Sequence, residues 1–139
     1  LNMDKTSNLY QEIHDLVRLE KYEFAIHVCD RAKQEGRGDE LVLRVKVFCL
    51  IQRKMWVQAL NVIAQLEKST IELPFEKSYC LYRTNNFEEA LSTLEALGDF
   101  TKTPGKMESR AVCYLKIQIL YRLGRFEEWE RLYSLVRPV

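Results

Sequence analysis

The sequence predicts an all-α fold of about four antiparallel helix pairs, and three observations carry that prediction. Apolar residues recur at intervals of three and four positions, which is the period of amphipathic helices. An aromatic residue followed three positions later by a small residue occurs three times, and a fourth copy has Trp129 in the small place. The aromatic residues, 34, 31 and 39 positions apart, are Tyr22, Trp56, Phe87 and Phe126.

Each of these aromatic residues is predicted to begin the second helix of a pair. The first helices are predicted in the amphipathic segments 8–19, 40–52, 75–83 and 109–123. Only two or three residues separate the two segments of a pair, and so short a turn makes the helices antiparallel.

The longer links between pairs contain glycine and proline, which stop helices. Asp39 and Ser109 are the predicted N-caps that follow two of these links. We expect one domain that is a fragment of a longer protein. Its predicted repeats are about 7–36, 39–69, 73–98 and 108–139.

Composition limits the classes of function. The chain has 29% charged residues and a net charge of +1, and a nucleic-acid surface would normally need a basic excess. No apolar run approaches the ~20 residues of a membrane span. The cysteines lack C-x-x-C spacing and a suitably placed histidine, so they predict buried, reduced thiols with no metal and no cofactor. They are Cys29, Cys49, Cys80 and Cys113.

The sequence offers no set of acid, base and nucleophile that would predict an enzyme. His14 and His27 fall on successive predicted helices, with no serine or cysteine arranged for a proton relay. The glycines of segment 98–106 lack the spacing and the Ser/Thr of a phosphate-binding loop. We therefore expect a non-catalytic protein.

The repeat period near 34 residues resembles that of the tetratricopeptide repeat family. This resemblance implies a right-handed superhelix in which the first helices line a concave face. Only Gly124 fills the turn position where that family favours glycine. A HEAT or armadillo solenoid is the alternative, although its period is longer, about 40 residues or more.

Two longer strings resemble the N-terminal repeats of a more particular family, the 72-kilodalton subunits of the eukaryotic signal recognition particle. They are VKVFCLIQRKMWVQALNVI at 45–63 and LPFEKSYCLYRTNNFEEALSTLE at 73–95, and residues 118–133 match that family too. The resemblance implies a scaffold that grips the C-terminal region of the 68-kilodalton subunit. It implies a cytoplasmic particle that targets proteins to the endoplasmic reticulum, with its RNA bound only through parts outside this chain. A general tetratricopeptide repeat adaptor, a co-chaperone or trafficking scaffold with another peptide, is the alternative.

Tyrosines and arginines recur at matched places on the predicted first helices. Tyrosine gives a large contact area, and arginine makes bidentate contacts with carboxylates. We therefore expect a groove for a partner segment with apolar anchors and acidic residues. Its predicted residues are Tyr10, His14, Arg18, Arg44, Phe48, Tyr79, Tyr82, Arg83, Tyr114, Gln118, Tyr121 and Arg122.

Several of these residues have a structural alternative. Core packing is an equal alternative for Phe48 and Tyr114, and for Phe75 on the predicted first helix 75–83, because aromatic residues at helical spacing usually pack inside. The arginines at helix ends would also complement the helix dipole. Finally, the apolar residues of 132–136 predict self-association through the last hairpin, because the ends of a solenoid need a polar cap.

Overall fold

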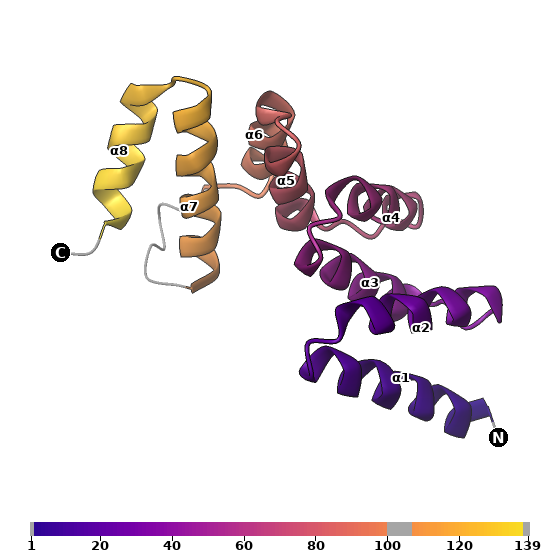
Figure 1. Ribbon diagram of the computed structural model, residues 1–139. Coiled ribbons are helices and arrows are strands. Elements are labelled where there is room, and N and C mark those ends of the chain that lie inside the picture. The colour runs from indigo at the N-terminus through magenta and orange to yellow at the C-terminus, as the bar shows by residue number, and fades with distance from the viewer. Residues whose placement is uncertain (1, 100–106, 138–139) are drawn as a thin grey trace. The chain divides into compact units, whose positions relative to one another are not determined.

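The computed structural model describes the backbone of residues 2–99 and 107–137, and the side chains of 8–99 and 109–137. In these residues all regular structure is helical, and eight helices follow one another in pairs (Figure 1). They are α1 (Asn2–Arg18), α2 (Tyr22–Gln34), α3 (Glu40–Gln52), α4 (Trp56–Lys68), α5 (Pro74–Arg83), α6 (Phe87–Glu95), α7 (Met107–Arg122) and α8 (Phe126–Val136). The all-α prediction is confirmed. The handedness of a superhelix stays a prediction, and positions 100–106 and 138–139 of the predicted link and last repeat lie outside the described residues.

The start of each second helix is the aromatic residue that the sequence predicts. One turn later Ala25, Ala59 and Ala90 are 0% exposed, because a methyl group there lets two helices approach closely. Trp129 has the same place in the fourth pair and is only half buried.

The predicted N-caps have different outcomes. Asp39 caps α3, since its Oδ1 accepts a hydrogen bond from the N–H of Val42 at 3.0 Å. Ser109 is the third residue of α7 and is 2% exposed, so its predicted capping role is wrong. The physical reason is that α7 begins at Met107, two residues before this serine.

The turn inside each pair has the same backbone geometry. The residue two positions before each second helix has a positive φ, and the next N–H donates to the carbonyl five residues back. This is the Schellman motif that ends many helices. The positive-φ residues are Glu20 (58°), Lys54 (61°), Asn85 (67°) and Gly124 (73°). Three pairs therefore hold a residue other than glycine in the left-handed region, which costs about 1 kcal/mol each.

The chain divides into two compact units, which we call the N-terminal unit (Leu1–Glu72) and the C-terminal unit (Leu73–Val139). Each contains two helix pairs. That both units form one domain stays a prediction.

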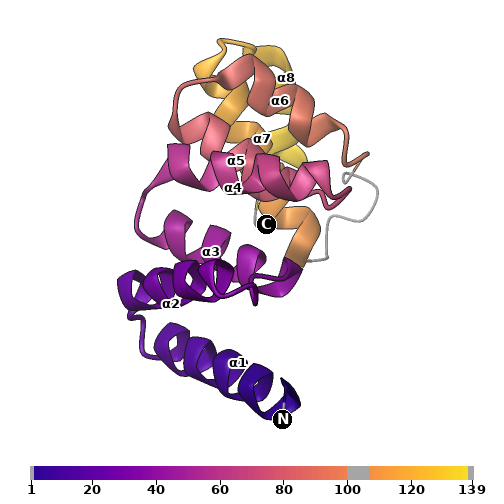
Figure 2. The same ribbon diagram turned by 90° about the vertical axis from the view of Figure 1, so that its right-hand side faces the viewer.

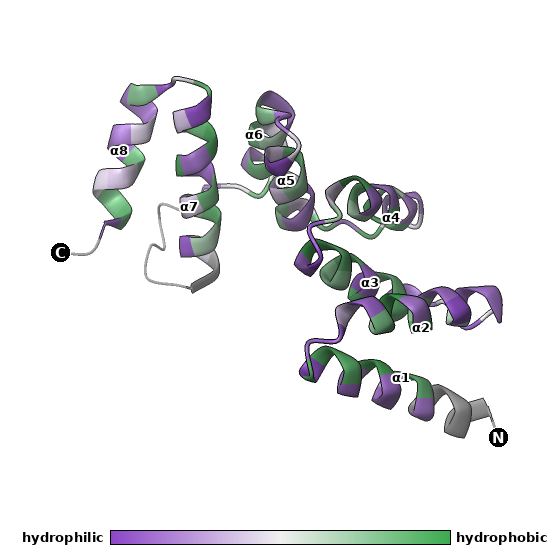
Figure 3. Ribbon diagram, in the orientation of Figure 1, coloured by the Kyte–Doolittle hydropathy of each residue, from purple (hydrophilic) through white to green (hydrophobic). Residues whose placement is uncertain are grey.

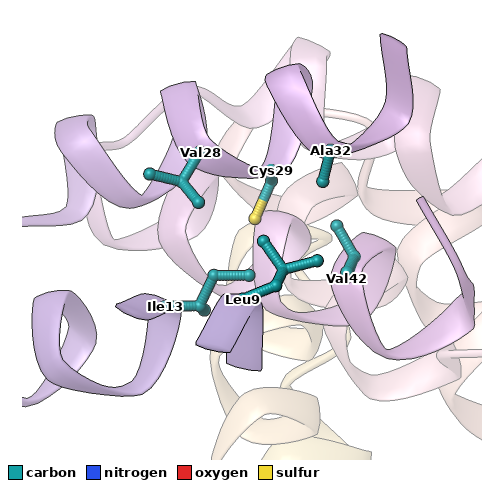
Figure 4. Packing of buried hydrophobic residues seen from close by; sticks show 6 residues of the cluster. All are labelled: Leu9, Ile13, Val28, Cys29, Ala32 and Val42. Carbon is teal, nitrogen blue, oxygen red and sulfur yellow. The ribbon is translucent and has the colours of Figure 1, made fainter. Parts of the chain in front are cut away.

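The N-terminal unit packs α1, α2 and α3 around one apolar core. Leu9 and Ile13 come from α1, while Val28, Cys29 and Ala32 come from α2 (Figure 4). Val42 of α3 completes this cluster. The helix α3 is apolar along most of its length (Figure 3), so these contacts bury only part of its apolar surface.

The C-terminal unit builds its core from α5 to α8. Leu94 of α6 and Ile119 of α7 are almost fully buried. Ser78 of α5 is 0% exposed and donates a hydrogen bond of 2.8 Å to the carbonyl of Ala90 in α6. This bond satisfies the one buried hydroxyl that lies between the two helices.

All four cysteines are free and buried, as the sequence predicts. Burial is the first cause that raises the pKa of each thiol, to about 12 for Cys29 and about 11 for Cys49 and Cys80. A raised pKa keeps these groups protonated and unreactive near neutral pH. In the same described residues, no helix is long and apolar enough to cross a membrane.

Candidate functional site

The first helices of the N-terminal unit, α1 and α3, enclose an open hollow of about 460 Å³. Its walls are almost wholly apolar. The lining residues are Tyr10, Ile13, His14 and Val17 of α1, and Leu41, Val42, Arg44, Val45 and Phe48 of α3. We call this feature the α1/α3 hollow.

Helical periodicity explains why these side chains meet. In each helix the lining positions are spaced by three and four residues, so they share one face. A surface helix normally turns a continuous polar face to water, whereas the apolar residues of α3 are spread around the helix and only Glu40, Arg44, Lys46 and Gln52 are polar. As a result Leu41 and Phe48 remain 49% and 44% exposed. Exposed apolar residues that gather around a hollow are typical of binding surfaces.

A polar contact holds one rim of the hollow. The hydroxyl of Tyr10 in α1 donates a hydrogen bond to Oδ2 of Asp39, whose Oδ1 caps α3 through the N–H of Val42. The hydrogen bond to Asp39 is the first cause that raises the pKa of Tyr10, followed by burial. One carboxylate therefore fixes the start of α3 and ties α1 to it.

The charged groups at the hollow have acids of their own helix beside them. Arg44 pairs with Glu40 one turn earlier, at 2.9 Å. His14 lies 3.7 Å from Asp15. These pairs are exposed, and exposed pairs contribute little to stability. A carboxylate of a partner can therefore exchange places with Glu40 at small cost and receive a charge-assisted bond from Arg44.

The structure brings four predicted groove residues together at this hollow: Tyr10, His14, Arg44 and Phe48. Arg18 is exposed at the end of α1 and does not line it. Core packing is not the role of Phe48, which is 44% exposed even though its ring meets Tyr22 edge to face at 5.9 Å. The part of these residues in binding stays a prediction.

Sequence reasoning missed Ile13, Val17 and Leu41, which line the hollow between the predicted residues. Their apolar side chains were indistinguishable from core residues in the helical pattern. The lack of a polar face on α3 was the signal that could have found Leu41.

The predicted residues of the C-terminal unit lie in a packed aromatic arrangement. Tyr82 of α5 packs on Phe87 of α6, with ring centroids 5.7 Å apart. The guanidinium of Arg122 in α7 lies 4.7 Å from the centre of the same ring, a cation–π contact. Tyr82 and Arg122 therefore both support the aromatic residue that begins α6.

The remaining predicted residues of that unit differ in exposure. Tyr114 is 43% exposed, so it is not a core residue, and Tyr121 is 57% exposed beside Phe126 and Trp129. Tyr79 and the alternative core residue Phe75 are half-buried. Gln118 and Arg83 are exposed. A hollow of about 320 Å³ in this unit is formed by other residues of α6, α7 and α8 and of the segment after α6.

The part of the chain that the structure describes contains no set of side chains suited to bind a metal ion. No group of three or more His, Cys, Asp or Glu side chains lies close enough together there to hold an ion. The chemistry that the α1/α3 hollow offers is therefore apolar contact with a charged rim.

Successive helical hairpins around apolar cores are an all-helical arrangement that is consistent with a tetratricopeptide-like repeat domain. No family model matches the chain. The chain is 33% identical over 132 residues to the human signal recognition particle subunit SRP72. The aligned region covers 93% of this chain and 18% of the human protein. The chain is 28% identical over 126 residues to SRP72 of Dictyostelium discoideum, covering 91% of this chain and 17% of that protein. The predicted resemblance to the 72-kilodalton subunits is thus confirmed, and the chain spans 18% or less of the length of these two relatives.

Proposed function

We propose that this chain is a non-catalytic protein-binding scaffold of the signal recognition particle. In this proposal the α1/α3 hollow grips the C-terminal region of the 68-kilodalton subunit. The contact would support co-translational targeting of proteins to the endoplasmic reticulum by a cytoplasmic particle. Similarity to proteins named as SRP72 supports membership of the particle.

The single observation that carries the binding role is the α1/α3 hollow itself. It has a volume of about 460 Å³, and its Phe48 and Leu41 are 44% and 49% exposed. Covering such residues removes apolar area from water, which is favourable by about 25 cal/mol per Å². The energy of a protein interface usually comes from a few central anchors of this kind, surrounded by polar contacts.

RNA is a poor occupant for the same surface. A protein that neutralises several phosphates needs a matching number of cations, and the chain carries a net charge of only +1. We propose that the RNA of the particle is bound through parts outside this chain. Partner binding to the hollow should therefore depend weakly on salt.

The test is a calorimetric titration of the chain with the C-terminal region of the 68-kilodalton subunit at two salt concentrations. We expect Phe48→Ala to weaken binding roughly tenfold or more, as loss of a central aromatic anchor does. Phe24→Ala is the matched control, because Phe24 is 62% exposed in the same unit but does not line the hollow. Equal affinities of the two variants would reject the hollow as the site, and circular dichroism checks that both fold.

The C-terminal unit is tested in the same titration with Tyr82→Ala/Arg83→Ala. Loss of binding in this variant alone, with a circular dichroism spectrum equal to that of the unaltered chain, would move the interface to α5. No binding of the unaltered chain at either salt would reject the 68-kilodalton region as its partner and favour a general repeat adaptor with another peptide.

Self-association through α8 is a separate proposal. Tyr133 and Leu135 are 43% and 59% exposed on this helix. Light scattering over a concentration series should show a mass that rises with concentration and falls back with Leu135→Ser. A constant monomer mass would contradict it.

A further inference from the structure

One edge of the N-terminal unit combines protruding apolar side chains with cations. The α1–α2 turn and the α3–α4 turn lie on the same side of the unit in both Figure 1 and Figure 2. We define the turn edge as the residues Arg18, Leu19, Lys21, Phe24, Lys54 and Val57. Its Leu19, Phe24 and Val57 are 55%, 62% and 60% exposed, more than any other large apolar side chain described in that unit.

The backbone of the turn edge is fixed. Both turns are Schellman motifs with a positive φ, at Glu20 and at Lys54. Arg53 after α3 pairs with Glu23 in the first turn of α2 at 3.5 Å, which joins the two turns. The apolar side chains are therefore presented on a preformed surface that needs no ordering step.

The charge of the turn edge is positive. Arg18, Lys21 and Lys54 are exposed and make no ion pair with another described residue. The pair of Arg53 with Glu23 is neutral as a whole, and Glu20 is the exposed acid of the first turn. Cations are thus interleaved with the three apolar side chains.

We propose that the turn edge docks on the surface of an anionic lipid bilayer. Lysine and arginine near such a surface are attracted to acidic headgroups, while adjacent apolar side chains enter the boundary between headgroups and acyl chains. The two sets of groups on the turn edge complement these two layers.

Two features favour a bilayer over other anionic partners. Leu19 and Val57 have no ring on which a nucleotide base could stack, so these two side chains would add no stacking energy to the binding of RNA. Leu19, Phe24 and Val57 are also 55–62% exposed, and they line neither the α1/α3 hollow nor a second hollow of about 290 Å³ between α2, α3 and α4. Protein anchors usually enter pockets, whereas a soft lipid surface accepts protruding groups.

This inference is independent of the proposed function. The α1/α3 hollow is lined by other residues than the turn edge, so either surface can fail without the other. A chain that binds the 68-kilodalton region but not vesicles would separate the two proposals, and so would the reverse.

The test is co-flotation of the chain with phosphatidylcholine vesicles that contain about 30% phosphatidylserine, and with pure phosphatidylcholine vesicles. We expect binding to the anionic vesicles only, and a loss of roughly tenfold or more with Leu19→Ser/Phe24→Ser. The matched control is Phe126→Ser, measured beside Phe24→Ser alone, because Phe126 is 55% exposed in the C-terminal unit and belongs to none of the proposed binding surfaces. Lys21→Glu/Lys54→Glu should abolish the preference for anionic lipid.

Three results would overturn the proposal. The first is that the unaltered chain binds neither kind of vesicle, and the second is that Phe126→Ser reduces binding as much as Phe24→Ser. The third is salt-sensitive binding of a structured RNA that Lys21→Glu/Lys54→Glu removes and Leu19→Ser/Phe24→Ser leaves intact, which would assign these cations to nucleic acid. Thermal unfolding of every variant verifies that the fold is retained.

Discussion

The two units have the same helical hairpins but differ in how the residues on the face of their first helices are packed. In the N-terminal unit the ring of Tyr22, which begins α2, meets the exposed Phe48 of α3, and a hollow stays open beside it. In the C-terminal unit Phe87, which begins α6, is held by Tyr82 of α5 and by the guanidinium of Arg122 in α7. The wedge at the turn is therefore a common structural device, while the residues around it decide whether an apolar surface is left for a partner.

The largest expected effect is a difference in reactivity between a thiol of the N-terminal unit, Cys29, and a thiol of the C-terminal unit, Cys113. The pKa of Cys29 is about 12, and that of a thiol in the unfolded chain is about 8.5. At pH 8 the thiolate fraction of Cys29 should therefore be roughly 1000-fold lower than that of an unfolded thiol. Burial also raises the pKa of Cys113, which Lys116 lowers and Asp99 raises, while Lys46 lowers the pKa of Cys29. A disulfide reagent followed by mass spectrometry should modify Cys113 first and Cys29 last.

The sign of the pH dependence follows from the same shifts. The folded thiols have a raised pKa, so their contribution to stability is complete below about pH 8.5 and is lost as pH rises towards 11 and 12. Denaturation midpoints should fall between pH 8.5 and 11. Labelling of Cys29 before Cys113 at pH 8 would contradict the prediction that the deeper burial of Cys29, 1% exposed against 3% for Cys113, protects its thiol.

The next effect concerns the small residue of each second helix. Ala59 is 0% exposed, and Ala59→Trp copies the residue that Trp129 places in the fourth pair. Overpacking of this kind should destabilise the fold by about 3 kcal/mol. Ala64→Trp is the control, because Ala64 is exposed in the same helix. Urea denaturation measures the stability of both variants. Equal midpoints would contradict the claim that close packing at position 59 requires a small residue.

The smallest effect lies in the turns, where the units differ in residue but not in backbone. Lys54→Gly should stabilise the chain by about 1 kcal/mol, since glycine adopts a positive φ without strain. Gly124→Ala should destabilise it by about the same amount. Lys33→Gly, inside α2, is the control and should destabilise it by about 1 kcal/mol. A loss of stability in Lys54→Gly would show that the lysine side chain matters more than its backbone angle.

The sequence was sufficient to predict the helices, because period, aromatic wedges and turn residues are local signals. It predicted the start of every second helix and four residues that line the α1/α3 hollow, among them Tyr10 and Phe48. It could not distinguish Leu41 at the hollow from a core residue, since exposure depends on what packs opposite. It likewise could not foresee that Arg122 lies over Phe87, a contact between residues 35 positions apart in the chain.

The most direct test of the central claim is amide hydrogen exchange of the chain with and without the C-terminal region of the 68-kilodalton subunit. The α1/α3 hollow predicts slower exchange in 10–17 and 41–48, with little change in the middle of α4. Protection confined to α5–α8, with α1 and α3 unchanged, would contradict the proposal that the N-terminal unit holds this partner.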